Sequence, residues 1–143
     1  MLIPDIQSHE ITDPISDSGY NIFIPLAHSI TETANHRSTL QLTSLLTTSK
    51  SAYNKENPSS DNYKKVKGDL EGPFSVGYAI SETHGATETR IVWFSTSYVL
   101  DEMLASYPGN LNLMLNSLKW MCNLEKNISV IKSKSLSGTE QLE

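Results

Sequence analysis

The chain has very few of the residues that build disulfides, metal sites and membrane spans. Its only cysteine is Cys122, which excludes an intrachain disulfide and any metal site made of several cysteines. No stretch approaches the roughly 18 consecutive apolar residues of a membrane-spanning helix. Met1 to Ile3 lead directly into Pro4 without a basic region, so we expect no signal peptide.

Basic residues are also scarce. The 143 residues contain 11 Lys and Arg against 16 Asp and Glu, which gives a formal net charge of −5. Because attraction to phosphates needs clustered Lys and Arg, this balance argues against a nucleic-acid-binding protein. The densest basic stretch, at residues 64–67, has acids on both sides and is interpreted as a solvated loop.

Short apolar runs predict the strands of a sheet. Residues 20–24, 39–43, 74–82 and 90–94 have the length and the apolar content of strands. The 74–82 stretch shows the clearest alternation of large and small side chains, and its small side chains would let a helix pack closely on that face.

The arrangement of these strands is partly predictable. The 74–82 and 90–94 strands are close enough in sequence to form a hairpin, so we expect a mixed sheet. The aromatic residues of the second strand, Trp93 and Phe94, are expected in the core. A closing strand is predicted near residues 129–131.

Two helices are predicted after the 90–94 strand, over residues 98–105 and 110–122. Asn110 follows Pro-Gly and is predicted to cap the second helix. The apolar positions of that helix share one broad face, which is expected to be buried: Leu111, Met114, Leu115, Leu118, Met121 and Cys122. The narrow polar stripe left for solvent contains Asn112, Asn116 and Lys119.

A chain of this length supports one domain with a single core. Residues 1–19 are interpreted as an extended lead-in, residues 50–72 as a flexible polar loop, and residues 135–143 as a tail. The final Leu-Glu pair resembles a cloning remnant. We therefore expect residues 1–143 to be an excised fragment of a larger protein.

The hydroxyl run Ser95-Thr96-Ser97 is the first candidate for chemistry, because it lies between a predicted strand and a predicted helix. Enzymes of the α/β class place nucleophiles at such turns, and helix N-termini bind anions. The sequence contains no G-x-S-x-G motif, and a hydroxyl run in this position more often caps the helix. We expect a helix cap or a ligand contact here, and no catalysis.

The histidines do not indicate a metal site. His9, His28, His36 and His84 have no spacing typical of metal ligands, and the chain has no phosphate loop and no dinucleotide fingerprint. No metal and no cofactor is therefore predicted. His9 lies between two prolines and is interpreted as a hydrogen-bonding residue that holds the lead-in, and it is a ligand-binding candidate together with the hydroxyl run.

Three stretches, in this order, carry a family resemblance. They are His9-x-Ile-Thr-x-Pro-Ile15, then Leu45-Leu-Thr-Thr-Ser49, and then residues 90–120 with the strand, the hydroxyl turn and the helix Leu113-Met-Leu-Asn-Ser-Leu-Lys-Trp120. Together they resemble the carboxy-terminal part of the GldG-type, gliding-motility-like auxiliary domain of bacterial ABC transport systems. The resemblance covers most of residues 3–134.

The resemblance implies a fold, a role and a location. The fold would be α/β with a mixed, mainly parallel sheet and packed helices, in flavodoxin-like or amidotransferase-like layers, as part of a larger domain. The role would be that of a non-catalytic auxiliary module on the extracytoplasmic face of the cell membrane. Permease or ATPase subunits would be its partners through the parent protein, the membrane tether would lie outside this chain, and the oligomeric state is left open.

Two alternatives stay open beside this interpretation. The chain would be a fragment of an α/β hydrolase or amidase if a serine of the 95–97 turn met His9 or His84. It would be a ligand sensor if the same turn held anions or sugar hydroxyls.

Overall fold

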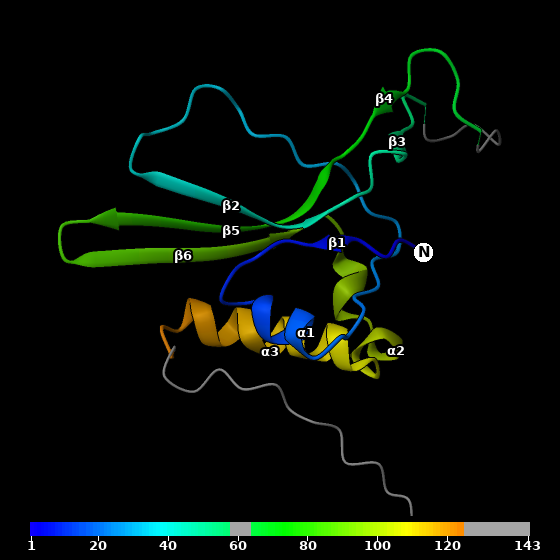
Figure 1. Ribbon diagram of the computed structural model, residues 1–143. Helices are drawn as coiled ribbons and strands as arrows, with labels where there is room; N and C mark the ends of the chain where they lie inside the picture. The colour runs from blue at the N-terminus through cyan, green and yellow to red at the C-terminus, as the bar shows by residue number, and fades with distance from the viewer. Residues whose placement is uncertain (58–63, 125–143) are drawn as a thin grey trace, which may run out of the picture.

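The computed structural model describes residues 1–57 and 64–124, and its centre is a four-stranded sheet (Figure 1). The strand order is β1-β2-β5-β6, and each neighbouring pair is antiparallel. Its strands are β1 (Asp5–Ile6), β2 (Leu40–Thr47), β5 (Ser75–His84) and β6 (Thr87–Phe94). Strands β3 (Tyr53–Asn54) and β4 (Leu70–Glu71) form a separate antiparallel pair, which projects from one end of the sheet.

The β5–β6 hairpin follows from its turn residues. His84 pairs with Thr87, so that only Gly85 and Ala86 lie in the turn, and Gly85 has a φ of 62°. A two-residue turn with a positive φ at its first position favours glycine there. The hairpin predicted from the short spacing of these strands is confirmed, and the strand predicted at 39–43 is confirmed as part of β2.

The prediction of a mainly parallel, flavodoxin-like or amidotransferase-like sheet was wrong. Every pairing in the described sheets is antiparallel. Parallel neighbours need a crossover connection of a dozen or more residues, usually a helix. Within the described residues, the one long helix follows β6, and no strand follows that helix. The closing strand predicted near residues 129–131 lies outside the described residues.

The helices lie on one side of the sheet (Figure 1). They are α1 (Asp13–Asp17), the 3-10 helix η1 (Ser97–Leu100), α2 (Glu102–Ala105) and α3 (Pro108–Met121). The helix predicted at 98–105 is therefore divided in two. The division is at Asp101, whose side chain accepts a hydrogen bond from the Met103 N–H and caps α2.

Helix α3 is rotated relative to the prediction. Pro108 occupies its first turn, so Asn110 lies inside the helix and is not the cap. The predicted core face is largely at the surface, with Leu118 50% exposed and Cys122 exposed. The buried face instead contains Gly109, Asn110, Asn112, Leu113, Asn116, Ser117 and Trp120.

The buried asparagines explain this rotation. Asn110 donates to the Phe23 carbonyl (2.8 Å) and accepts from the Phe23 N–H (3.0 Å), while Asn116 donates to the Ile11 carbonyl (2.9 Å). Irregular backbone packed against the core must find partners for its peptide groups. The asparagines supply them, so α3 turns its amides inward.

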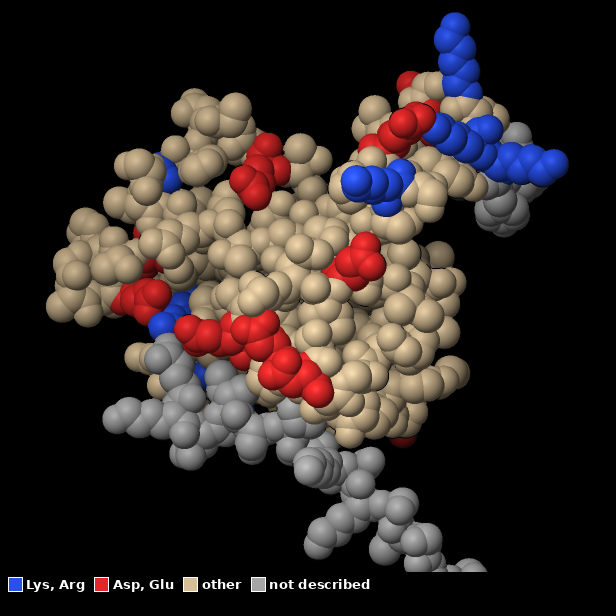
Figure 2. Space-filling model, viewed as in Figure 1, with Lys and Arg blue, Asp and Glu red and all other residues tan. Residues whose placement is uncertain are grey.

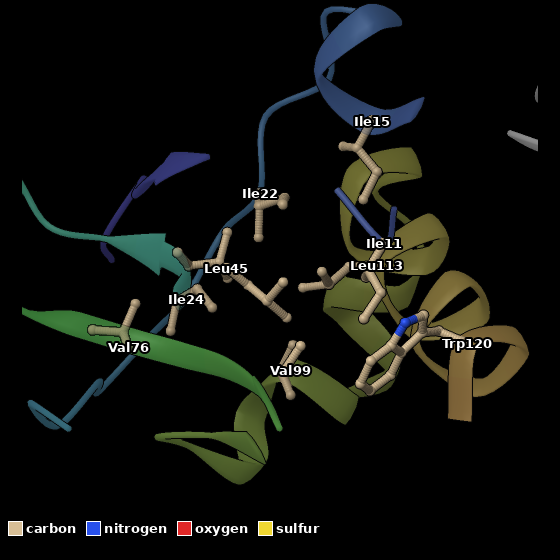
Figure 3. Close-up of a cluster of buried hydrophobic side chains, with 11 residues drawn as sticks. Ile11, Ile15, Ile22, Ile24, Leu45, Val76, Val99, Leu113 and Trp120 are labelled. Atoms are coloured by element: carbon tan, nitrogen blue, oxygen red, sulfur yellow. The ribbon is translucent and has the colours of Figure 1, made fainter. Parts of the chain in front are cut away.

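Helix α3 holds two amino-terminal segments that differ from their predictions. A strand was predicted for residues 20–24, and an extended lead-in for residues 1–19. Residues 20–24 do not form the predicted strand, and their one bridge joins Ile24 to Leu2. The lead-in contains β1 and α1. Aliphatic side chains from these segments, from the sheet and from α3 meet in the core shown in Figure 3, and Trp120 closes one end of it.

Candidate functional site

The side of the sheet opposite the helices carries the most open apolar surface on β5 and β6. The register places Tyr78 beside Trp93 and Ile80 beside Ile91 on adjacent strands. Leu42 of β2 lies beside Ile80. Because side chains alternate along a strand, these residues share one face, while the side chains between them point toward the helices.

A connecting segment, residues 26–39, crosses this face and is called the strap (Figure 1). One end is fixed by the Ile30 N–H, which donates to the Ser75 carbonyl (2.8 Å). At the other end, Arg37 and Thr39 both bind the Glu82 carboxylate, at 2.8 and 2.7 Å. Residues 31–36 between these two attachments are all exposed.

The strap and the sheet enclose an open trough with a volume of about 450 Å³. Clefts that bind small ligands usually have volumes of about 300–1,000 Å³ and mostly apolar walls. The sheet contributes Leu40, Leu42, Tyr78, Ile80 and Trp93. The strap contributes Ser29, Ile30, Thr31, Glu32, Thr33 and His36. This trough is the candidate site.

Trp93 is the largest exposed apolar group in the trough. It is 56% exposed, and Ile91 on the same face of β6 is 51% exposed. The prediction that Trp93 belongs to the core was wrong, whereas Phe94 packs against the core and Trp120 is buried within it. Large adjacent apolar side chains in contact with water indicate a binding surface.

The polar groups of the trough converge on Tyr78. Burial raises the pKa of its phenol; the nearby Ser75 works in the opposite direction, and the nearby Glu32 raises the pKa again. A raised pKa keeps the phenol protonated at neutral pH, so that Glu32 is the charged group of the trough beside Tyr78. No Lys or Arg is among the residues that line the trough. The largest group of Lys side chains on the face shown in Figure 2 covers the distant β3–β4 projection.

Of the predicted ligand residues, Ser95 and Thr96 have structural partners, whereas Ser97 is exposed at the first position of η1. The Ser95 hydroxyl accepts from the His28 backbone N–H (3.3 Å), and the Thr96 hydroxyl accepts from the Tyr98 N–H (3.2 Å), which caps η1. In the described part of the chain, no histidine ring forms a hydrogen bond with these hydroxyls. The helices that follow have only one turn each, which gives them a weak dipole.

His9 lies apart from this turn, against the last turn of α3. Its ring meets the Trp120 ring edge-on, with 5.3 Å between centroids, and its Nδ1 accepts from the Ile11 N–H (3.1 Å). Burial lowers the pKa of His9; Glu10 and Asp13 oppose this effect and Arg90 adds to it. The ring contact with Trp120 holds the lead-in to the helix. The hydrogen bond joins two residues of the lead-in itself, whereas the sequence interpretation expected a hydrogen bond from His9 to hold the lead-in.

Comparisons with protein-family models, with curated proteins and with solved structures gave no match. Within residues 1–57 and 64–124, no three His, Cys, Asp or Glu side chains are grouped in a way that could hold a metal ion. No helix in that part of the chain is both long enough and apolar enough to cross a membrane.

The sequence does contain one signal of the trough. Residues 90–94 are apolar at nearly every position, whereas a strand with one solvated face alternates apolar and polar residues. Both faces of β6 therefore need a cover. The helices cover one face, and Ile91 and Trp93 on the other face are only partly covered.

Proposed function

We propose that this protein is a non-catalytic binding module that holds a segment of a partner protein against the open face of its sheet. The observation that carries the proposal is the exposed Trp93 in an apolar trough of ligand size. Aromatic side chains are enriched at protein interfaces and dominate the binding energy there.

The sequence resemblance makes the proposal more specific. It supports a role as the auxiliary module of an ABC-type transport system, on the extracytoplasmic face of the membrane and with permease or ATPase subunits as partners. Of these, the membrane-spanning permease is the subunit that a module on that face would contact. Of the three stretches that carry the resemblance, one ends β2, and another forms β6 and α3. The mainly parallel fold that the resemblance implied is absent, so the resemblance bears only on the proposed role and partner.

Site-specific photocrosslinking in cells tests this proposal. The protein expressed in cells would carry Trp93→p-benzoylphenylalanine, and a matched variant would carry Leu118→p-benzoylphenylalanine on the exposed side of α3. We expect the Trp93 variant to crosslink to a permease subunit, identified by mass spectrometry, and the Leu118 variant to give much less. Equal crosslinking from both positions, or a permease crosslink from Leu118 alone, would contradict the proposal.

The hydrolase alternative has a separate test. A panel of ester, amide and phosphate substrates should show no turnover, because the hydroxyls of the 95–97 turn have no histidine partner in the described structure. Reproducible hydrolysis that is lost in Ser97→Ala would establish an enzyme and refute the binding-module proposal.

A further inference from the structure

The trough places an aromatic ring face and a carboxylate close together. Trp93 and Tyr78 are direct neighbours across β5 and β6, and both line the trough together with Glu32. The faces of aromatic rings carry partial negative charge and attract cations within about 6 Å of the ring centre. The aromatic rings and the carboxylate both favour a positively charged ligand group.

The charges around the trough are not balanced by the chain itself. Glu32 is the one carboxylate among the lining residues, and none of them is Lys or Arg. The cation of the strap, Arg37, is engaged by Glu82 outside the lining (2.8 Å). His36, which does line the trough, directs its Nδ1 to the Arg37 carbonyl (3.1 Å). The Glu32 carboxylate would repel an anion. A purely apolar ligand would displace the water that hydrates this carboxylate and would offer no hydrogen bond in return.

We propose that the trough receives an arginine side chain flanked by apolar residues, presented by the partner protein. The guanidinium would stack on Trp93 and pair with Glu32, while the flanking apolar side chains would contact Leu42 and Ile80. Arginine fits better than lysine because its planar group stacks on aromatic rings and binds carboxylates through two N–H groups. This inference rests on the proposed function and names the chemistry of the partner.

Matched tripeptides test the inference on the isolated chain. The probes are acetyl-Leu-Arg-Leu-amide and acetyl-Leu-Gln-Leu-amide, followed by NMR through the indole N–H signal of Trp93 at about pH 8, where imidazole is ordinarily neutral. We expect the Arg peptide to bind about tenfold more tightly than the Gln peptide, the range of a partly desolvated cation–π contact. Glu32→Gln and Trp93→Leu should each reduce this preference to about twofold or less, while Leu118→Ala should leave it unchanged.

The outcomes separate this inference from the proposed function. Equal binding of both peptides, or no binding of either, overturns the arginine assignment, whereas the proposed function is decided by the permease crosslink. N,N′-diacetylchitobiose is the third probe. If this sugar shifts the Trp93 signal at lower concentration than the Arg peptide, the trough is a glycan site and the inference is wrong.

Discussion

Asn110 gives the sharpest test of how α3 is oriented. Its side chain is fully buried and forms two hydrogen bonds with the Phe23 peptide groups, 87 residues away in sequence. Asn110→Ala removes both bonds and leaves a donor and an acceptor without partners. Each such buried group costs about 1–3 kcal/mol. Because Phe23 is only partly buried, water can reach some of the exposed groups, and we expect a loss of about 2–4 kcal/mol.

The loss is large relative to a typical total stability of about 5–15 kcal/mol. Urea denaturation would measure it as a change in the free energy of unfolding, and the melting temperature should fall by about 5–15 °C. Leu118→Ala is the matched control, since the sequence pattern predicted Leu118 to be buried. A buried leucine would cost about 2–5 kcal/mol, whereas Leu118 is 50% exposed and should cost under about 1 kcal/mol. A Leu118→Ala loss greater than that of Asn110→Ala would refute the observed orientation.

Asn110→Asp distinguishes lost hydrogen bonds from lost volume. The carboxylate would still accept from the Phe23 N–H, but it would face the Phe23 carbonyl, which accepts from the amide in the native protein. This raises the pKa of the new carboxyl in the folded state above its unfolded value of about 3.9. The variant should therefore gain stability relative to the wild type as the pH falls, and a constant difference across pH would contradict the assignment.

Three further predictions concern Gly109, His9 and Gly85. Gly109→Ala should lower the free energy of unfolding by several kcal/mol, because its Cβ would lie 2.0 Å from the Asn21 carbonyl oxygen. Helix propensity alone predicts a gain of up to about 1 kcal/mol, and such a gain would show that this contact is absent. Burial lowers the pKa of His9, so as the pH falls the unfolded state binds this proton before the folded state does. Stability should therefore fall as the pH drops below about 6.5. In a plot of stability against pH, His9→Asn should flatten this part of the curve and His84→Asn should not. Gly85→Ala should cost about 1–3 kcal/mol in urea denaturation, because its φ of 62° is strained for other residues.

The hairpin and β2 were predictable because their signals are local. Alternation over residues 74–82 and the short distance to residues 90–94 define two neighbouring strands, and the Gly85-Ala86 pair supplies a turn that fits between them. These features depend on residues close together in sequence, so the sequence by itself was sufficient.

The orientation of α3 could not be read from the same kind of pattern. Its leucines occupy several sides of the helix, and periodicity alone favours burying the most apolar one. The orientation of the helix depends on the peptide groups of Phe23 and Ile11, which lie 87 and 105 residues from the asparagines that bind them. These peptide groups need hydrogen-bond partners, and asparagine supplies them. Long-range hydrogen bonds of this kind leave no periodic trace in the sequence.

The candidate site was likewise predictable only in part. The sequence by itself determined the strand that carries Trp93, the hydroxyl turn after it, and the lack of a metal-ligand or nucleophile motif. Only the tertiary structure decided which face of β6 the helices cover, and therefore that Trp93 is exposed while Phe94 packs inward. It also decided that the strap brings Glu32 beside Tyr78, 46 positions away in the numbering. The physical reason is that side-chain alternation separates the two faces of a strand, while only the packing of distant segments determines which face each of them covers.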